Sequence, residues 1–98
     1  ETYYALTNTN DLYVWGSNVF GEKINNGLLI ESPLLLMSNV VDYNYNYNYL
    51  INSNKELYFW NSNILNPTMI DTNVNKVHTS KYYNYYYNTN NLKEVIGL

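Results

Sequence analysis

The chain has 98 residues, enough for one small domain, and a formal net charge of −3. It contains neither arginine nor cysteine, which excludes bidentate arginine contacts to phosphate or guanine, a disulfide framework and a thiolate metal site. The hydrophobic share of 46% is enough for a core, but the longest apolar runs are too short to span a bilayer. We therefore expect a small folded unit with no membrane contact and no specific contact to nucleic acid.

The first predicted elements are two strands, residues 3–7 (YYALT) and 12–15 (LYVW), which are rich in aromatic and aliphatic side chains. The polar residues 8–11 between them predict a hairpin turn. No stretch has apolar residues at helical spacing over three turns, and Asn is unfavourable inside a helix. These patterns predict an all-β protein made of antiparallel sheets.

The hairpin sequence occurs a second time in the chain. Residues 6–18 (LTNTNDLYVWGSN) match residues 51–63 (INSNKELYFWNSN) without a gap, and a weaker third copy places Leu92 at the same position as the first leucine of the signature. This repeat predicts units at about residues 1–39 and 40–75 and the start of a third at about 76–98, so that the chain begins and ends mid-repeat. The signature residues, to which we assign a structural role, are Leu12, Tyr13, Trp15, Gly16 and Asn18 in the first copy and Leu57, Tyr58, Trp60 and Asn63 in the second.

A run of alternating tyrosine and asparagine, residues 43–49, precedes the second copy. A single strand through this run would be unusually long for a globular sheet. We predict two strands, Val40 to about Tyr45 and about Tyr49 to Asn52, with a turn near residues 46–48, because Asn tolerates the left-handed conformation of many turns. The alternative is one continuous edge strand with the tyrosines on one face.

The first unit combines Ala5, Leu6 and Thr7 with the signature residues of the first copy and with Gly21. In this combination it resembles the repeat of the regulator-of-chromosome-condensation family. The resemblance covers the chain as about two repeats, and the second is degenerate, because Asn61 follows its tryptophan where the family has Gly and its Gly-rich connector is gone. The resemblance implies four-stranded blades of a β-propeller, incomplete as a ring in a chain of this length. It rests on Ala5, Leu6, Thr7, Leu12, Tyr13, Trp15, Gly16, Asn18 and Gly21.

Catalytic, metal-binding and cofactor-binding residues are not predicted. His78 is the single histidine and has no carboxylates at a recognisable metal-site spacing. Asp11 and Glu56 occupy the same position in the two copies, so we expect them in separate turns and not as a catalytic pair. No serine stands in a nucleophile-elbow motif, and no glycine-rich phosphate loop is present.

Aromatic residues are the remaining candidates for function. We expect Trp15 and Trp60 to pack within or between sheets, because they share one repeat position. The tyrosines near the C-terminus are a better candidate for partner contact, since tyrosine is enriched at interfaces; the alternative is that they fill strands and core. These residues are Tyr82, Tyr83, Tyr85, Tyr86 and Tyr87.

The resulting expectation is a non-enzymatic, propeller-type repeat segment that acts as an interaction or scaffold element within a larger protein or assembly. Its partners would be other proteins or further blades of a longer chain. The resemblance also implies an alternative function, part of a guanine-nucleotide exchange factor for a small GTPase. A minor alternative is a glycan-binding module. The Asn- and Tyr-rich composition is typical of an AT-rich genome, and the lack of a usable glycosylation sequon favours an intracellular location.

Overall fold

The computed structural model describes residues 2–17, 29–44, 47–60, 67–80, 84–89 and 91–94. In this part the regular secondary structure consists of strands, as expected, and no helix is present that could cross a membrane. The strands are β1 (Thr2–Leu6), β2 (Leu12–Ser17), β3 (Leu29–Met37), β4 (Val40–Asn44), β5 (Tyr49–Asn52), β6 (Leu57–Phe59), β7 (Thr68–Asp71), β8 (Val74–Thr79), β9 (Asn84–Asn88) and β10 (Asn91–Glu94).

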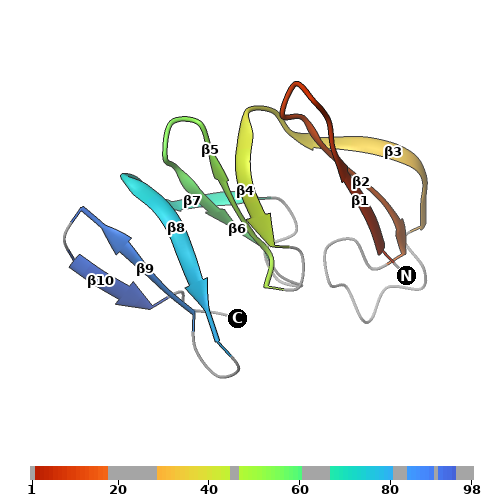
Figure 1. The fold of residues 1–98 in the computed structure, drawn as a ribbon. Helices are drawn as coiled ribbons and strands as arrows, with labels where there is room; N and C mark the ends of the chain where they lie inside the picture. Colours follow the sequence, from red (N-terminus) through yellow and green to blue (C-terminus); the bar gives the residue numbers. More distant parts are fainter. Residues whose placement is uncertain are drawn as a thin grey trace.

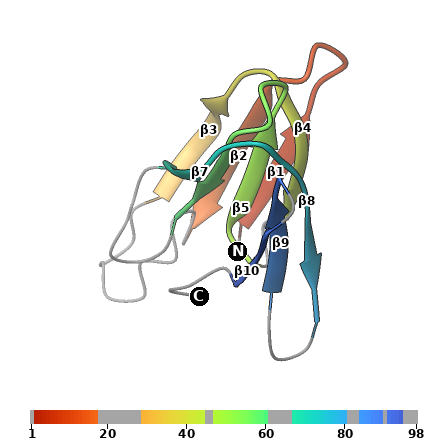
Figure 2. The same ribbon diagram turned by 90° about the vertical axis from the view of Figure 1, so that its left-hand side faces the viewer.

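These strands form three antiparallel sheets, which lie side by side in chain order (Figure 1). The first sheet holds β1–β3, the central sheet β4–β7 and the third sheet β8–β10. Within each sheet every strand pairs with the next along the chain, so each sheet is an open meander and none closes into a barrel. Figure 2 views the same stack with the third sheet toward the reader.

Strand β5 of the central sheet is buried on both faces, because its successive side chains point to opposite sides and a neighbouring sheet packs on each side. Tyr49 and Ile51 of β5 lie opposite Phe59 and Leu57 of β6, and all four pack against the third sheet. Leu50 belongs to the other face, which packs against the first sheet. That second cluster consists of Leu12, Val40, Leu50 and Trp60, with Leu36, Met37, Tyr43 and Tyr58 at its margin.

The Tyr/Asn run contains a turn, as predicted. Strand β4 ends at Asn44, β5 begins at Tyr49, and Asn48 between them has a left-handed φ of 59°. The Tyr47 N–H donates to the side-chain oxygen of Asn44 at 3.3 Å. The alternative of one continuous strand is therefore wrong; residues 45 and 46 of the predicted turn lie outside the described residues.

The two strongest copies of the repeat fold into the same five-residue turn. In residues 7–11 the Thr7 N–H donates to the Asp11 carbonyl, and in residues 52–56 the Asn52 N–H donates to the Glu56 carbonyl, at 3.0 and 3.1 Å. The fourth residue of each turn is left-handed, with a φ of 66° at Asn10 and 62° at Lys55. In each turn a side-chain oxygen of the first residue also accepts from the backbone N–H of the last residue, at 3.0 Å.

Each of these turns also sets the position of the next sheet. The Asn10 carbonyl accepts from the N–H of Val40, the first residue of the central sheet, at 2.9 Å. The Lys55 carbonyl accepts from the N–H of Val74, the first residue of the third sheet, at the same distance. Because the same backbone bond joins both pairs of sheets, the repeat in the sequence corresponds to a repeated step in the stacking.

Candidate interaction surfaces

The first and third sheets each have one face that no other described sheet covers. In the first sheet, Leu12 faces the central sheet, so Tyr13 and Trp15 of the same strand project from the opposite face. Tyr3 lies across from Trp15, and the two rings stack with centroids 5.8 Å apart and an interplanar angle of 16°. We call the surface of Tyr3, Tyr13 and Trp15 the N-terminal open face.

The two repeat tryptophans therefore have different surroundings. Trp60 of the central sheet has 0% of its surface exposed, because the first sheet lies over it. Trp15 holds the equivalent position in the first sheet and is only partly buried, beside Tyr3. The sequence predicts that both tryptophans pack within or between sheets. Trp60 packs in this way, whereas Trp15 contributes to a surface.

The third sheet has an open face at the other end of the stack. On β9, Tyr85 and Tyr87 project away from the central sheet, and on β10 Leu92 lies opposite Tyr87. Tyr87 and Leu92 have 51% and 57% of their surfaces exposed. We call the surface of Tyr85, Tyr87 and Leu92 the C-terminal open face.

This face has the same register as the covered face of the central sheet. Tyr87 pairs with Leu92 across β9 and β10, just as Ile51 pairs with Leu57 across β5 and β6. Ile51 and Leu57 are fully buried under the third sheet. The C-terminal open face thus repeats the pattern of a surface that, one sheet earlier, is covered by protein.

The candidate tyrosines of the C-terminal tract do not act as one surface. Tyr86 points toward the central sheet, is 5% exposed, and donates its hydroxyl hydrogen to Asp71 Oδ2 at 2.9 Å. The expectation that it contacts a partner does not fit this placement, because strand alternation directs it inward between Tyr85 and Tyr87. Tyr82 and Tyr83 lie outside the described residues.

Asp71 is the polar centre of the interface between the central and third sheets. Besides Tyr86, it accepts hydrogen bonds from Asn88 Nδ2 at 2.7 Å, from its neighbour Thr72 N–H at 2.8 Å and from Lys93 Nζ at 3.2 Å. Burial, the largest influence, raises the pKa of Asp71, but the hydrogen bonds from Thr72, Tyr86 and Lys93 and the Lys93 charge together hold it below its usual value. Burial, followed by the Asp71 hydrogen bond and charge, raises the pKa of Tyr86 to about 12.

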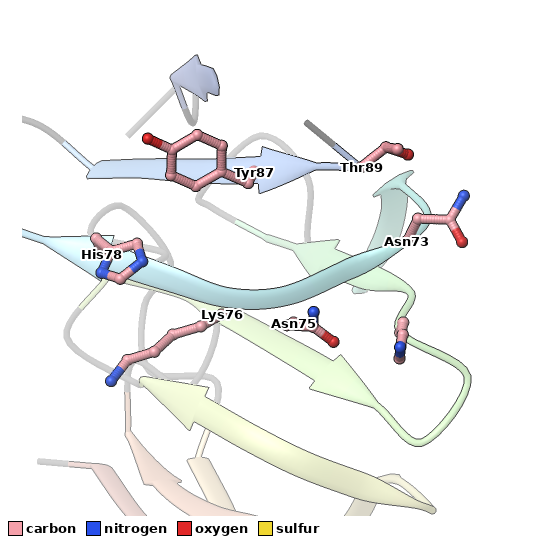
Figure 3. Close-up of a pocket in the computed structure, with 7 residues that line it drawn as sticks. Asn73, Asn75, Lys76, His78, Tyr87 and Thr89 are labelled. Carbon is pink, nitrogen blue, oxygen red and sulfur yellow. The ribbon is translucent and has the colours of Figure 1, made fainter. Parts of the chain in front are cut away.

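A basic cavity lies beside the C-terminal open face. It has a volume of about 370 Å³ and is lined by side chains of β8, β9, the β5–β6 and β7–β8 turns and the turn after β9 (Figure 3). Figure 3 shows Tyr87 on β9 with His78 and Lys76 on the neighbouring β8. The full lining is Lys55, Asn73, Asn75, Lys76, His78, Tyr87 and Thr89.

Two parts of this arrangement were not anticipated from the sequence, the Asp71 cluster and the cavity. His78 was expected to have no special role, and the structure places it with Lys55 and Lys76 in one lining. The spacing of the repeat could have placed Lys55 in a turn next to the third sheet, but nothing in the sequence pairs Asp71 with Tyr86. Two signature residues, Asn18 and Asn63, lie outside the described residues.

The described residues contain no group of three or more His, Asp or Glu side chains that could hold a metal ion. Comparison of the chain with models of known protein families, with curated proteins and with solved structures finds no match to any of them. The function of the chain is therefore inferred from its sequence and from the geometry of the open faces and the cavity.

Proposed function

We propose that this chain is a non-catalytic, β-propeller-type repeat segment that acts as an interaction or scaffold element within a larger protein or assembly. On this proposal the four-stranded central sheet is a blade of the kind found in the regulator-of-chromosome-condensation family, and the first and third sheets, with three described strands each, are incomplete blades. Protein covers the open faces at the two ends. The shared stacking bond from turn to following sheet supports a repeated blade unit.

A single observation carries the proposal. Leu57 is fully buried, while Leu92, at the equivalent position of the next sheet, is 57% exposed. Packing of apolar side chains against a neighbouring sheet stabilises the packed state by about 25 cal/mol for each Å² of apolar surface removed from water. Contiguous apolar surface of this kind is a mark of interaction sites in proteins.

The native mass of the particle that carries this chain tests the proposal. We expect size exclusion with light scattering, followed by mass spectrometry, to find the chain in a particle well above its own 11.6 kDa when it is purified from its natural source. A stable, lone 11.6-kDa monomer would contradict the proposal.

Variants of the exposed surface provide a second test. Leu92→Asp should shift the chain toward free monomer, because it places a charge in the proposed contact. Ile70→Asp on β7 is a matched control, since Ile70 is 41% exposed on the central sheet and belongs to neither open face. Equal dissociation by both variants would indicate a general loss of folding instead of a lost contact.

A further inference from the structure

The C-terminal open face differs in charge from the surface it repeats. Residues 74–78 of β8 are equivalent to residues 40–44 of β4. Each strand pairs antiparallel with the next strand along the chain, and each has a register shift soon after its first residue. Lys76 therefore takes the position of Asp42, and His78 that of Asn44. In the same way, Lys55 stands in its turn where Asn10 stands in the preceding one.

Two of these substitutions, Lys55 and Lys76, collect positive charge in a chain that is acidic overall. Lys55, Lys76 and His78 line one cavity, and no carboxylate among the described residues forms an ion pair with either lysine. Lys93 provides the contrast, because its ammonium group lies 3.2 Å from Asp71. The acidic Glu94 shares a face with Tyr85 but is not among the described residues that line the cavity.

Another sheet of the same kind would not complement this charge. The sides of the central and third sheets that pack on a preceding sheet carry apolar, aromatic, amide and lysine side chains and no carboxylate among the described residues. These residues are Val40, Tyr43, Leu50, Tyr58 and Trp60 in the central sheet, and Val74, Val77, Tyr86, Asn88 and Lys93 in the third. A further repeat built like these would cover Tyr87 and Leu92 but would bring no carboxylate to Lys55 and Lys76.

We propose that the C-terminal open face and its cavity dock a separate acidic protein, whose carboxylates meet Lys55, Lys76 and His78 while its apolar side chains cover Tyr87 and Leu92. This inference rests on the proposed function and adds the chemistry of the partner. The exposed tyrosine and leucine supply apolar contact area. The lysines steer an acidic partner toward it and disfavour basic ones.

Zero-length carbodiimide cross-linking of the native particle tests this inference, because it joins a lysine to a carboxylate only when the two are in contact. We expect mass spectrometry to identify Lys55 or Lys76 linked to an Asp or Glu of a different polypeptide. The Lys93–Asp71 pair serves as an internal positive control, since it should be linked in every folded sample.

Three results would overturn the inference while leaving the proposed function intact. In the first, the particle stays large and the control link forms, but both cavity lysines remain unlinked. In the second, they link to Glu94. In the third, they link to a second copy of this chain or to a further repeat of the same polypeptide. A lone monomer would instead contradict the proposed function and this inference together.

A charge-matched pair of variants measures the same contact. Lys76→Gln should weaken retention in the particle about tenfold, as expected for loss of one member of a desolvated charge pair. Asn8→Asp makes the same change in net charge on an exposed turn of the first sheet and should leave retention unchanged. Equal weakening by both variants, or by neither, would contradict a specific acidic contact at Lys76.

Discussion

The central sheet and the two outer sheets follow the same repeat but differ in what covers them. Trp60 and Leu57 of the central sheet are fully buried, whereas Trp15 of the first sheet is partly buried and Leu92 of the third sheet is exposed. The signature residues therefore determine where a side chain projects, while the neighbouring sheet determines whether it contributes to the core. Equivalent positions in one chain give matched tests of this difference.

The two interfaces of the central sheet differ as well. The contact with the first sheet is an apolar cluster around Trp60. The contact with the third sheet adds the Asp71 cluster to an apolar core. Among the described residues of the two interfaces, a carboxylate that accepts hydrogen bonds across the contact lies only in the second, so the two interfaces should respond differently to acid.

The largest expected effect comes from truncating the two tryptophans. Trp60→Ala should lower the free energy of unfolding by about 3–5 kcal/mol, because it leaves a cavity in a closed core. Trp15→Ala should cost only about 1–2 kcal/mol, since the ring is partly exposed and loses mainly its stacking with Tyr3. Urea denaturation followed by circular dichroism would measure both values. Equal losses would mean that the first sheet's outer face is covered in the isolated chain.

A smaller effect is expected from Asp71→Ala. The variant removes the acceptor for Tyr86, Asn88 and Lys93, and should lower the free energy of unfolding by about 1.5–3 kcal/mol. Asp11→Ala changes the same residue type in an exposed hairpin turn and should cost less than about 1 kcal/mol. A loss at Asp11 as large as that at Asp71 would show that the cluster adds nothing beyond an ordinary turn.

The Asp71 carboxylate should also make the stability of the fold depend on pH in the acid range. The pKa of Asp71 is lower in the folded chain than its ordinary 3.8, so the stabilisation is fully present above that value and is lost as the pH falls through the folded pKa. Asp71→Asn should remove this part of the acid dependence. Denaturation curves of the parent and the variant between about pH 2 and 6 would show the difference; parallel pH profiles would contradict it.

The response to alkali should come from two buried tyrosines. Burial, aided by Asp42, raises the pKa of Tyr49 to about 12, and that of Tyr86 is also about 12, against an ordinary value of 10.0. Above about pH 10 the unfolded chain loses these protons and the folded chain keeps them, so stability falls as the pH rises toward 12. Absorbance titration of phenolate should show a late phase in the parent that is smaller in Tyr86→Phe. A single phase near pH 10 in the folded chain would contradict the prediction.

The fold class and the turn in the Tyr/Asn run could be predicted because they depend on local rules. Strand periodicity follows from backbone geometry, and Asn48 adopts the left-handed conformation that asparagine tolerates. The repeat offset also placed Asp11 and Glu56 in equivalent turns, where the structure has them.

The cavity and the Asp71 cluster could not be predicted because they join residues across sheets. Asp71 meets Tyr86 and Lys93 only after the third sheet has packed on the central one, and no periodicity in the sequence specifies that contact. The orientation of the C-terminal tyrosines likewise depends on the packed structure. The composition of the tyrosine tract predicts partner contact for the whole tract, but the strand register determines that Tyr86 faces inward and Tyr87 outward.

The smallest expected effect compares the two equivalent turns. Asn10 and Lys55 have nearly the same φ, 66° and 62°, yet a lysine side chain is disfavoured in the left-handed region, while asparagine tolerates it. Lys55→Gly should therefore raise the free energy of unfolding by about 0.5–1 kcal/mol, after allowance for the flexibility of glycine in the unfolded chain. Asn10→Gly should change it by only a few tenths, because the asparagine is under less strain. Thermal unfolding of both variants would resolve the difference. A Lys55→Gly variant that is less stable than the parent would show that the lysine stem packs against the third sheet, so that the turn which places that sheet also holds it through side-chain contact.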